Sequence, residues 1–193
     1  MKTTKLFSIA VLVGSLFMGQ SLMAQSKMSK KEDTKMVGGS AMYPSKNIVE
    51  NAVNSKDHTT LVVAVKAAEL VDVLTSEGPF TVFAPTNAAF DKLPKGTVES
   101  LVQPENKTQL QTILKYHVVS GNWNAFDLAK AIKDNKGKAV IKTVSGGTIT
   151  AWMDGKDVYI SDENGNKAKV TIADVKQSNG VIHVIDTVLL PKS

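Results

Sequence analysis

The sequence predicts a single α+β domain in which helices come first and strands come last. Apolar residues recur at helical spacing between about positions 45 and 133, whereas strand-like runs separated by glycine turns fill the chain from position 140 onward. Such segregation of helices from hairpins is typical of α+β folds. The 193 residues, 42% of them hydrophobic, suffice for one domain with its own core.

The first 24 residues have the pattern of an export signal. Lys2 and Lys5 precede an almost wholly apolar run over residues 6–17, and small and polar residues then lead to a cleavage bond after Ala24. This run is shorter than the ~20 residues that a bilayer requires. We therefore expect a signal peptide over residues 1–24 and a secreted or periplasmic mature protein without a transmembrane span; an uncleaved membrane anchor is the alternative.

Residues 25–40 are polar and rich in lysine, and they end in Gly38-Gly39. They show no apolar periodicity, so we predict a flexible linker. A basic tether to an acidic surface is the alternative, which Glu32 and Asp33 weaken by diluting the charge. The globular domain is then expected to occupy residues 41–193.

Helical patterns dominate the first part of this domain. Ser45 is the expected N-cap of the first helix, and the second helical region is expected to break near Ala68 and to stop at Gly78-Pro79. The predicted helices span about residues 45–53, 59–74, 86–93, 106–116 and 125–133, with one further turn near 98–102.

Strand patterns begin with the β-rich run at residues 80–84, after which Thr86 or Asn87 is expected to cap a helix. Asn164-Gly165 and Asn179-Gly180 are strong hairpin signals in the last third of the chain. The final run is almost continuously apolar, as expected for a strand that is buried on both faces. The later strands are predicted at residues 140–144, 148–153, 158–161, 169–172 and 181–190.

Composition excludes several classes of function. The chain has no cysteine, which rules out a disulfide scaffold, a thiolate metal site and a cysteine nucleophile. Its net charge of +5 comes from lysine alone, and without arginine we expect no specific nucleic-acid recognition. No serine-hydrolase elbow, P-loop or dinucleotide motif is present, and the turn around Asn164 lacks the glycine and glutamate of a calcium loop. We therefore predict a non-enzyme without cofactor or metal.

Three blocks together resemble the fasciclin (FAS1) domain: residues 78–90, which begin Gly-Pro-Phe-Thr-Val; residues 114–119 around Tyr116-His117; and residues 179–191, which begin Asn-Gly-Val-Ile-His. The resemblance covers about residues 41–191 and is to small, secreted or periplasmic bacterial members. It implies a β-sandwich-like wedge with helices packed on it, in which the first and third blocks lie side by side as central strands. It also implies an interaction or adhesion module that binds a protein or polysaccharide at a cell surface or matrix.

Three polar residues stand in apolar surroundings. Buried polar groups normally find partners, so we expect His117 and His183 to be hydrogen-bonded core residues. A metal pair is the alternative, which the lack of a third ligand at recognisable spacing weakens. Asp186 is expected to accept amide or hydroxyl hydrogen bonds, because an unpaired buried carboxylate is costly.

The resemblance also points to candidate partner-binding residues. In adhesive members of the family, an acidic residue followed by a branched apolar one, upstream of the third block, is linked to cell attachment, as is the Tyr-His region. Here these are Asp174-Val175 and Tyr116-His117. The match is partial, because the two residues before Asp174 differ from the adhesive motif. The favoured alternative is that Val175 is core and Asp174 bonds local backbone.

Two other functions remain open at this stage. The first is a carbohydrate or small-ligand binder, for which Trp123, Trp152 and Tyr159 are candidate stacking platforms. The second is an enzyme of unknown chemistry, whose sign would be a carboxylate and a histidine converging in a cleft. The sequence indicates neither the partner nor the oligomeric state.

Overall fold

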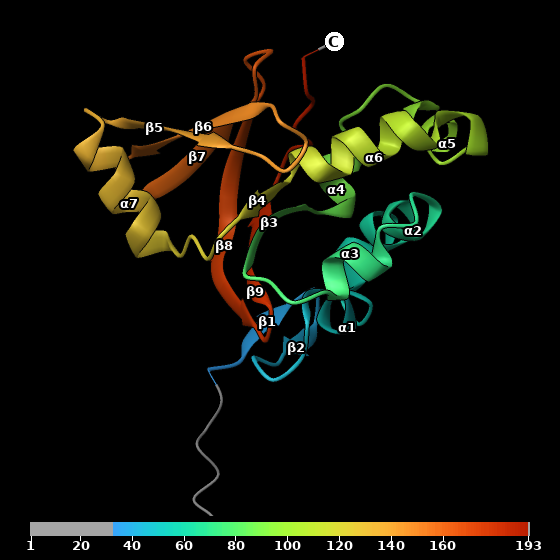
Figure 1. The fold of residues 1–193 in the computed structure, drawn as a ribbon, viewed down its shortest axis with the longest axis horizontal. Coiled ribbons are helices and arrows are strands. Elements are labelled where there is room, and N and C mark those ends of the chain that lie inside the picture. Colours follow the sequence, from blue (N-terminus) through green and yellow to red (C-terminus); the bar gives the residue numbers. More distant parts are fainter. Residues whose placement is uncertain (1–32, 193) are drawn as a thin grey trace, which may run out of the picture. The chain divides into compact units, whose positions relative to one another are not determined.

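The computed structural model describes residues 33–192. The predicted signal peptide and residues 25–32 of the predicted linker lie outside these residues. No helix in the described part is long and apolar enough to cross a membrane. The elements (Figure 1) are β1 (Lys35–Val37), β2 (Ser40–Met42), α1 (Ile48–Ala52), η1 (Lys56–His58), α2 (Thr59–Ala67), α3 (Val71–Thr75), β3 (Phe80–Pro85), α4 (Asn87–Phe90), α5 (Thr97–Leu101), η2 (Pro104–Asn106), α6 (Lys107–Tyr116), β4 (Val118–Ser120), α7 (Ala125–Asp134), β5 (Lys138–Lys142), β6 (Thr148–Asp154), β7 (Asp157–Ser161), β8 (Lys167–Gln177) and β9 (Gly180–Ile185).

The helices follow the predicted pattern, with one corrected boundary. The N-cap of α1 is Asn47 and not Ser45: the Asn47 side chain accepts the Glu50 N–H, and the Glu50 carboxylate accepts the Asn47 N–H. This reciprocal capping box satisfies two amide donors that a serine at position 45 is too far away to serve. The predicted break near Ala68 is confirmed, because α2 ends at Ala67 and Glu69 adopts a positive φ of 54°.

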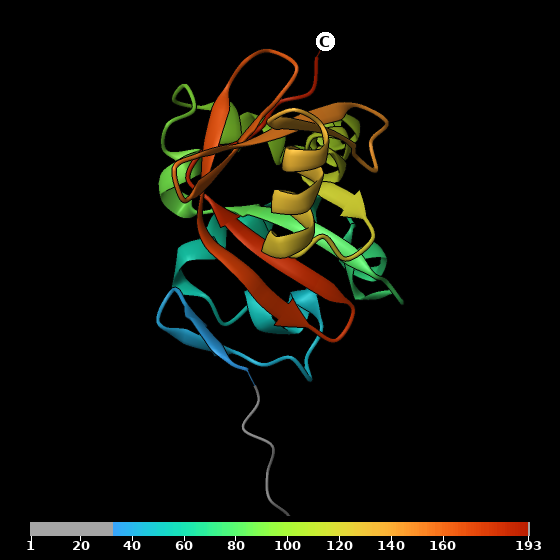
Figure 2. The same cartoon turned by 90° about the vertical axis from the view of Figure 1, so that its left-hand side faces the viewer.

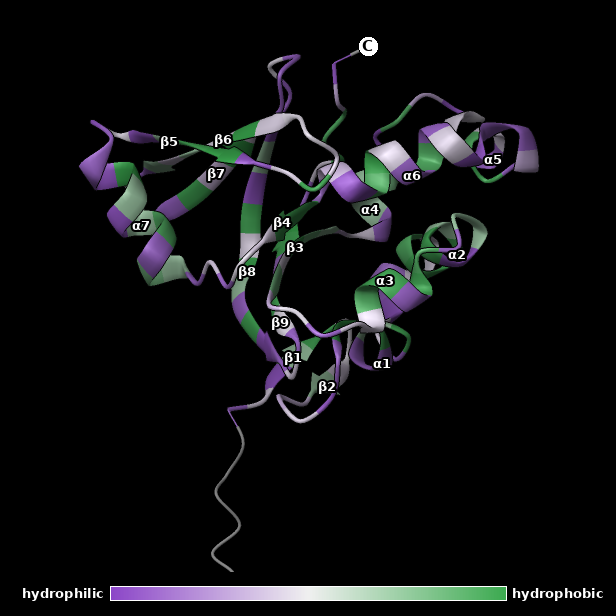
Figure 3. Cartoon of the chain, viewed as in Figure 1, coloured by the Kyte–Doolittle hydropathy of each residue, from purple (hydrophilic) through white to green (hydrophobic). Residues whose placement is uncertain are grey.

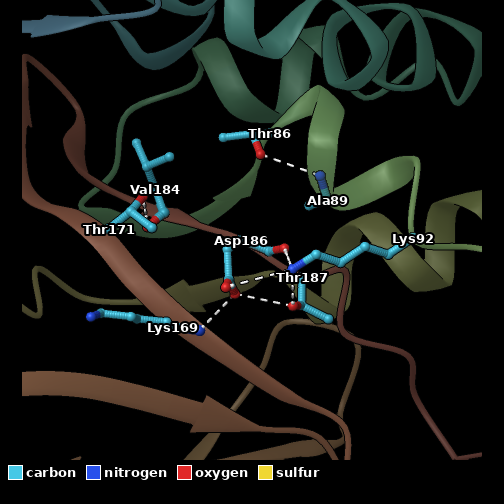
Figure 4. A network of polar contacts seen from close by, with 8 residues as sticks. All are labelled: Thr86, Ala89, Lys92, Lys169, Thr171, Val184, Asp186 and Thr187. Carbon is cyan, nitrogen blue, oxygen red and sulfur yellow. Dashed lines mark hydrogen bonds and ion pairs between the residues drawn. The ribbon is translucent and has the colours of Figure 1, made fainter.

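Thr86 and Asn87 were the two candidate N-caps of one helix, but in the structure each binds the first turn of a different helix. The Thr86 hydroxyl accepts the Ala89 N–H at 3.3 Å and caps α4, as Figure 4 shows. The Asn87 side chain instead accepts the Thr60 N–H at 3.0 Å, at the start of α2, and donates to the Lys56 carbonyl. The segment after β3 therefore holds the beginnings of two helices.

Strands β1 and β2 form a two-stranded sheet, and the other seven strands form one mixed sheet in the order β4-β3-β9-β8-β7-β6-β5. Strands β3 and β9 pair in parallel from Phe80↔Gly180 to Pro85↔Ile185, which confirms that the first and third sequence blocks are neighbouring strands. The other neighbours in this sheet are antiparallel. The long β8 pairs with β7 at its beginning and with β9 from Val170 onward, so the sheet bends along it (Figures 1 and 2).

Both faces of the central strands are covered, which explains their continuous apolar sequence. Val82 and Ile182 face a cluster that includes residues of α1, α2, α3 and α6, whereas Phe83 and Ile185 face a second cluster with α7 and the hairpins β5 to β7. The covering helices carry apolar and hydrophilic residues in alternation (Figure 3). The Val144 N–H donates to the Val118 carbonyl at 2.8 Å, so the chain just beyond β5 also reaches β4, at the opposite edge of the sheet.

Several strand boundaries differ from the predictions. Strand β8 runs over Lys167–Gln177 and not only over residues 169–172, because its later part pairs with β9. Strands β1 and β2 pair within and beyond the segment that was predicted to be flexible, and Val37 is only 2% exposed. The domain therefore begins before residue 41, because this short hairpin gains its stability from packing on the core and not from its own pattern. Strand β9 ends at Ile185 and not at residue 190, because the Asp186 side chain, in place of a backbone carbonyl, accepts the Lys169 N–H.

Candidate functional site

Asp174 lies in an irregular part of β8. The pairing register with β9 shifts between Val170 and Ile172 and again between Ile172 and Val175, and Asp174 itself has a φ of 54°. An aspartate tolerates this left-handed conformation better than most residues. The irregularity buries Val175, which is 1% exposed, and leaves Asp174 half-buried.

The Asp174 carboxylate is held at the beginning of α7. Its Oδ1 accepts the Ala125 N–H at 2.6 Å, which satisfies one of the free amide groups of the first turn. A carboxylate at this end of a helix is also favoured by the helix dipole. The Asp174 backbone N–H donates to Nδ1 of His183 at 3.3 Å. Asp174 thus links β8, β9 and α7.

His183 is fully buried and both of its ring nitrogens are occupied. Its Nε2–H donates to the Trp123 carbonyl at 2.7 Å, while Nδ1 accepts the Asp174 N–H. The ring also stacks on Phe83, with 5.5 Å between the ring centroids. These partners require the neutral imidazole, and burial lowers the pKa of His183 although the Trp123 carbonyl opposes this.

His117 is held in the same manner. Its Nδ1–H donates to the Ile113 carbonyl at 2.8 Å, and its Nε2 accepts the Leu189 N–H at 3.0 Å. Burial lowers the pKa of His117 to about 4. The structure therefore confirms that both histidines are buried and hydrogen-bonded. In residues 33–192, no three His, Cys, Asp or Glu side chains are grouped so that they could hold a metal ion.

Tyr116 is also a core residue. Its hydroxyl donates to the Thr148 carbonyl and accepts the Glu163 N–H at 3.2 Å. Burial raises the pKa of Tyr116 to about 12, although the Glu163 backbone contact opposes this. The hydroxyl thus joins the end of α6 to two hairpins, and the ring presents no surface to a partner.

The structure separates the four predicted partner-binding residues by exposure. The side chains of Tyr116, His117 and Val175 are at most 3% exposed, so only Asp174 reaches solvent. These three buried residues could contact a partner directly only if the domain opened. A partner contact at Asp174 remains a prediction, alongside the backbone contacts that it makes.

Phe126 is the exposed aromatic residue nearest in sequence to this site, and the sequence analysis missed it. It follows Ala125, whose N–H binds Asp174, and its side chain is 75% exposed. The buried residues of α7 are Leu128 and Ile132, four positions apart, and Phe126 lies off that stripe. In the predicted helix, Phe126 already lies off the apolar face, and this pattern could have identified it as an exposed aromatic residue.

The three candidate stacking residues do not form one platform. Trp152 and Tyr159 lie opposite each other on β6 and β7 and stack with 5.7 Å between centroids. The ammonium groups of Lys167 and Lys169 lie 5.9 and 6.0 Å from the centroids of these two rings. Trp123 lies elsewhere, in the loop before α7, and its indole N–H donates to Ser120.

Asp186 behaves as predicted (Figure 4). Its Oδ1 accepts the Lys169 N–H at 2.8 Å and the Thr187 hydroxyl at 3.0 Å, and the Lys92 ammonium lies 3.6 Å from Oδ2. Burial raises the pKa of Asp186, but these hydrogen bonds and the nearby lysine outweigh it and hold the pKa below its ordinary value. The carboxylate is a structural link between β8 and the end of β9.

Replacing Asp174 with alanine is expected to lower the free energy of unfolding by about 1–2 kcal/mol. The variant loses the contact with the Ala125 N–H and places alanine in a left-handed conformation. Asp174→Asn keeps an oxygen acceptor and tolerates that conformation, so it should lose much less. Urea unfolding of the three proteins measures the difference, and equal midpoints for Asp174→Ala and the parent would contradict this structural role.

Comparison with known proteins identifies the family. The family model of the fasciclin domain matches residues 56–191. Protein sll1483 of Synechocystis sp. is 43% identical over 193 residues, with 99% of each chain covered. Periostin of Homo sapiens is 36% identical over 137 residues, which are 71% of this chain and 15% of that protein. The solved FAS1 domain pair from the insect cell adhesion molecule fasciclin I superimposes with a TM-score of 0.67 at 20% identity, covering 75% of this chain and 51% of that one. The chain belongs to the fasciclin domain family.

Proposed function

We propose that this fasciclin-domain protein is an exported, non-catalytic interaction module that binds a protein or polysaccharide at a cell surface or matrix. Three observations support the proposal. The chain belongs to a family that includes a cell adhesion molecule of insects. Its first 24 residues have the pattern of an export signal. Its two fully paired histidines, His117 and His183, are held in roles within the core.

The observation that carries the proposal is the exposed Phe126, which directly follows Ala125, the residue whose N–H binds the half-buried Asp174. An aromatic side chain that is 75% exposed contributes nothing to the core, yet it can bury a large apolar area against a partner. Binding hot spots are commonly such aromatic anchors surrounded by polar groups. Asp174 occupies the position that the family resemblance links to attachment, and Phe126 adds the apolar contact that the buried Val175 does not offer.

Phe126→Ser is expected to weaken binding to the partner surface by about tenfold or more, since an anchor of this kind contributes about 2 kcal/mol. The measurement is saturable binding of the fluorescently labelled protein to isolated cell envelopes or matrix, with unlabelled protein as competitor. Val63→Ser is the matched control, because Val63 is an apolar residue of α2 that is 56% exposed. Both variants should keep the thermal stability of the parent, since neither side chain is buried.

Two outcomes would overturn this assignment. Undiminished binding by Phe126→Ser would place the contact surface elsewhere, and equal losses in both variants would indicate non-specific adsorption. If binding instead fell in Trp152→Ala and not in Phe126→Ser, the second candidate function would be favoured. That function is binding of an acidic polysaccharide to the Trp152–Tyr159 pair and its lysines.

A further inference from the structure

An apolar cavity lies on the helical side of the sheet. It has a volume of about 110 Å³, and residues of α1, α2, α3 and α6 form its walls together with β3 and β9. Leu61 and Leu74 line it from the helices, and Val82 and Ile182 line it from the sheet. Val73 and Val144 also line it and are 44% and 40% exposed, so the lining extends to the protein surface.

The only charged side chains in the lining are two lysines. Lys66 comes from α2 and Lys115 from α6, and no aspartate or glutamate lines the cavity. The ammonium group of neither lysine makes an ion pair or hydrogen bond within residues 33–192. Since the lining is apolar, their methylene stems cover the wall while their ammonium groups can reach water. The cavity therefore combines an apolar interior with uncompensated positive charge at its edge.

Water is a poor occupant of this interior. An ordered buried water makes about three hydrogen bonds to otherwise unsatisfied groups. His58 supplies the one buried side-chain atom in the described residues without a hydrogen-bond partner, its Nε2, and the ring lines the cavity. The other lining histidine, His117, has both nitrogens occupied. One available group cannot hold a water well, so an apolar occupant is favoured.

We propose that this cavity binds a fatty acid, with the end of its chain inside and its carboxylate between Lys66 and Lys115. An engineered cavity of about 150 Å³ holds a benzene molecule, so this smaller one takes the last few carbons of a chain. The following methylenes lie against the half-exposed Val73 and Val144, where they cover apolar surface. The two lysines select an anionic headgroup, because no other charge is near it in the lining.

The first experiment measures binding to the protein after removal of lipids with organic solvent or a hydrophobic resin. Calorimetric titration compares hexanoate, dodecanoate, dodecanol and dodecyltrimethylammonium. Dodecanoate has six more methylenes than hexanoate and is expected to bind at least roughly tenfold more tightly, since burial of only two of them is worth that factor. It should bind about tenfold more tightly than dodecanol, and the cationic amphiphile should bind most weakly.

Charge-reversal variants test the role of the lysines. The double variant Lys66→Glu/Lys115→Glu is expected to lose at least about tenfold in dodecanoate affinity and to leave the affinity for dodecanol unchanged. The matched control is the double variant Lys142→Glu/Lys156→Glu, which makes the same change of net charge at exposed lysines outside the lining. Equal melting temperatures in the absence of ligand would show that all variants fold.

Several results would overturn the proposal. Failure of dodecanoate to bind at millimolar concentration would show that the cavity is closed to ligands. Equal affinities for dodecanoate and dodecanol, or equal losses in the two double variants, would show that the lysines do not select a carboxylate. Binding to phosphatidylglycerol vesicles without binding to monomeric dodecanoate would indicate a membrane surface in place of a fatty-acid site.

Discussion

Lowering the pH from 7 to about 4.5 is expected to destabilise the protein by more than surface carboxylates can explain. The cause is the pair of buried histidines, His117 and His183. In each ring one nitrogen donates to a carbonyl and the other accepts a backbone N–H. Protonation would place a second N–H against that backbone N–H, so the folded state excludes the proton.

The direction of this pH effect on stability, and the pH range in which it occurs, follow from the pKa values. Above pH 6.5 the His117 imidazole is neutral in both the folded and the unfolded protein, so it adds no pH dependence. Between pH 6.5 and about 4 only the unfolded state takes up the proton, and stability is lost as the pH falls. For His117 the loss reaches roughly 3 kcal/mol near pH 4. Burial lowers the pKa of His58 and His183 as well, and the same sign applies.

The variant His117→Gln tests this cause. At pH 7 it should be less stable than the parent by about 1–3 kcal/mol, because the Ile113 carbonyl and the Leu189 N–H lose a well-placed partner. Between pH 7 and 4.5 it should lose less stability than the parent, so the two curves converge. Urea unfolding at several pH values measures this. Parallel curves would show that His117 takes no part in acid unfolding.

The parts of the fold that the sequence predicted well are those in which local pattern and tertiary environment agree. The continuous apolar run at the end of the chain predicted a strand buried on both faces, and β9 is an interior strand of the sheet, between β3 and β8. The family resemblance predicted its pairing with β3, which periodicity alone could not give. The helix break near Ala68 was visible because the apolar stripe changes there.

Other features depend on contacts that no local pattern contains. Strand β4 has three residues, and it is a strand because it pairs with β3. The burial of Val175 was the favoured expectation and is confirmed, but the Asp174 carboxylate binds the Ala125 N–H, 49 residues away in the chain, and not the local backbone. That contact follows from the irregularity of β8, which the residue types in that segment do not predict. The cavity could not be predicted either, because the buried apolar residues that line its interior also have the pattern of ordinary core positions.

Gly180→Ala is expected to cost at least roughly 3 kcal/mol of the free energy of unfolding, or to prevent folding altogether. Gly180 begins β9 and pairs with Phe80, the first residue of β3. A Cβ atom built on Gly180 would lie 1.9 Å from the Phe80 carbonyl oxygen, and backbone atoms cannot give way as a flexible side chain can. Removing this clash would require β3 and β9 to separate where their pairing begins.

Gly155→Ala is the control that separates this contact from the general cost of replacing a turn glycine. Gly155 lies in the turn between β6 and β7 with a φ of 60°, and a Cβ there would meet no atom within 4 Å. Its substitution should therefore cost only about 1 kcal/mol, from the left-handed backbone. Thermal and urea unfolding of both variants give the comparison. Equal losses would mean that β3 and β9 can move apart at little cost, and that the close approach at Phe80 and Gly180 does not hold the centre of the fold.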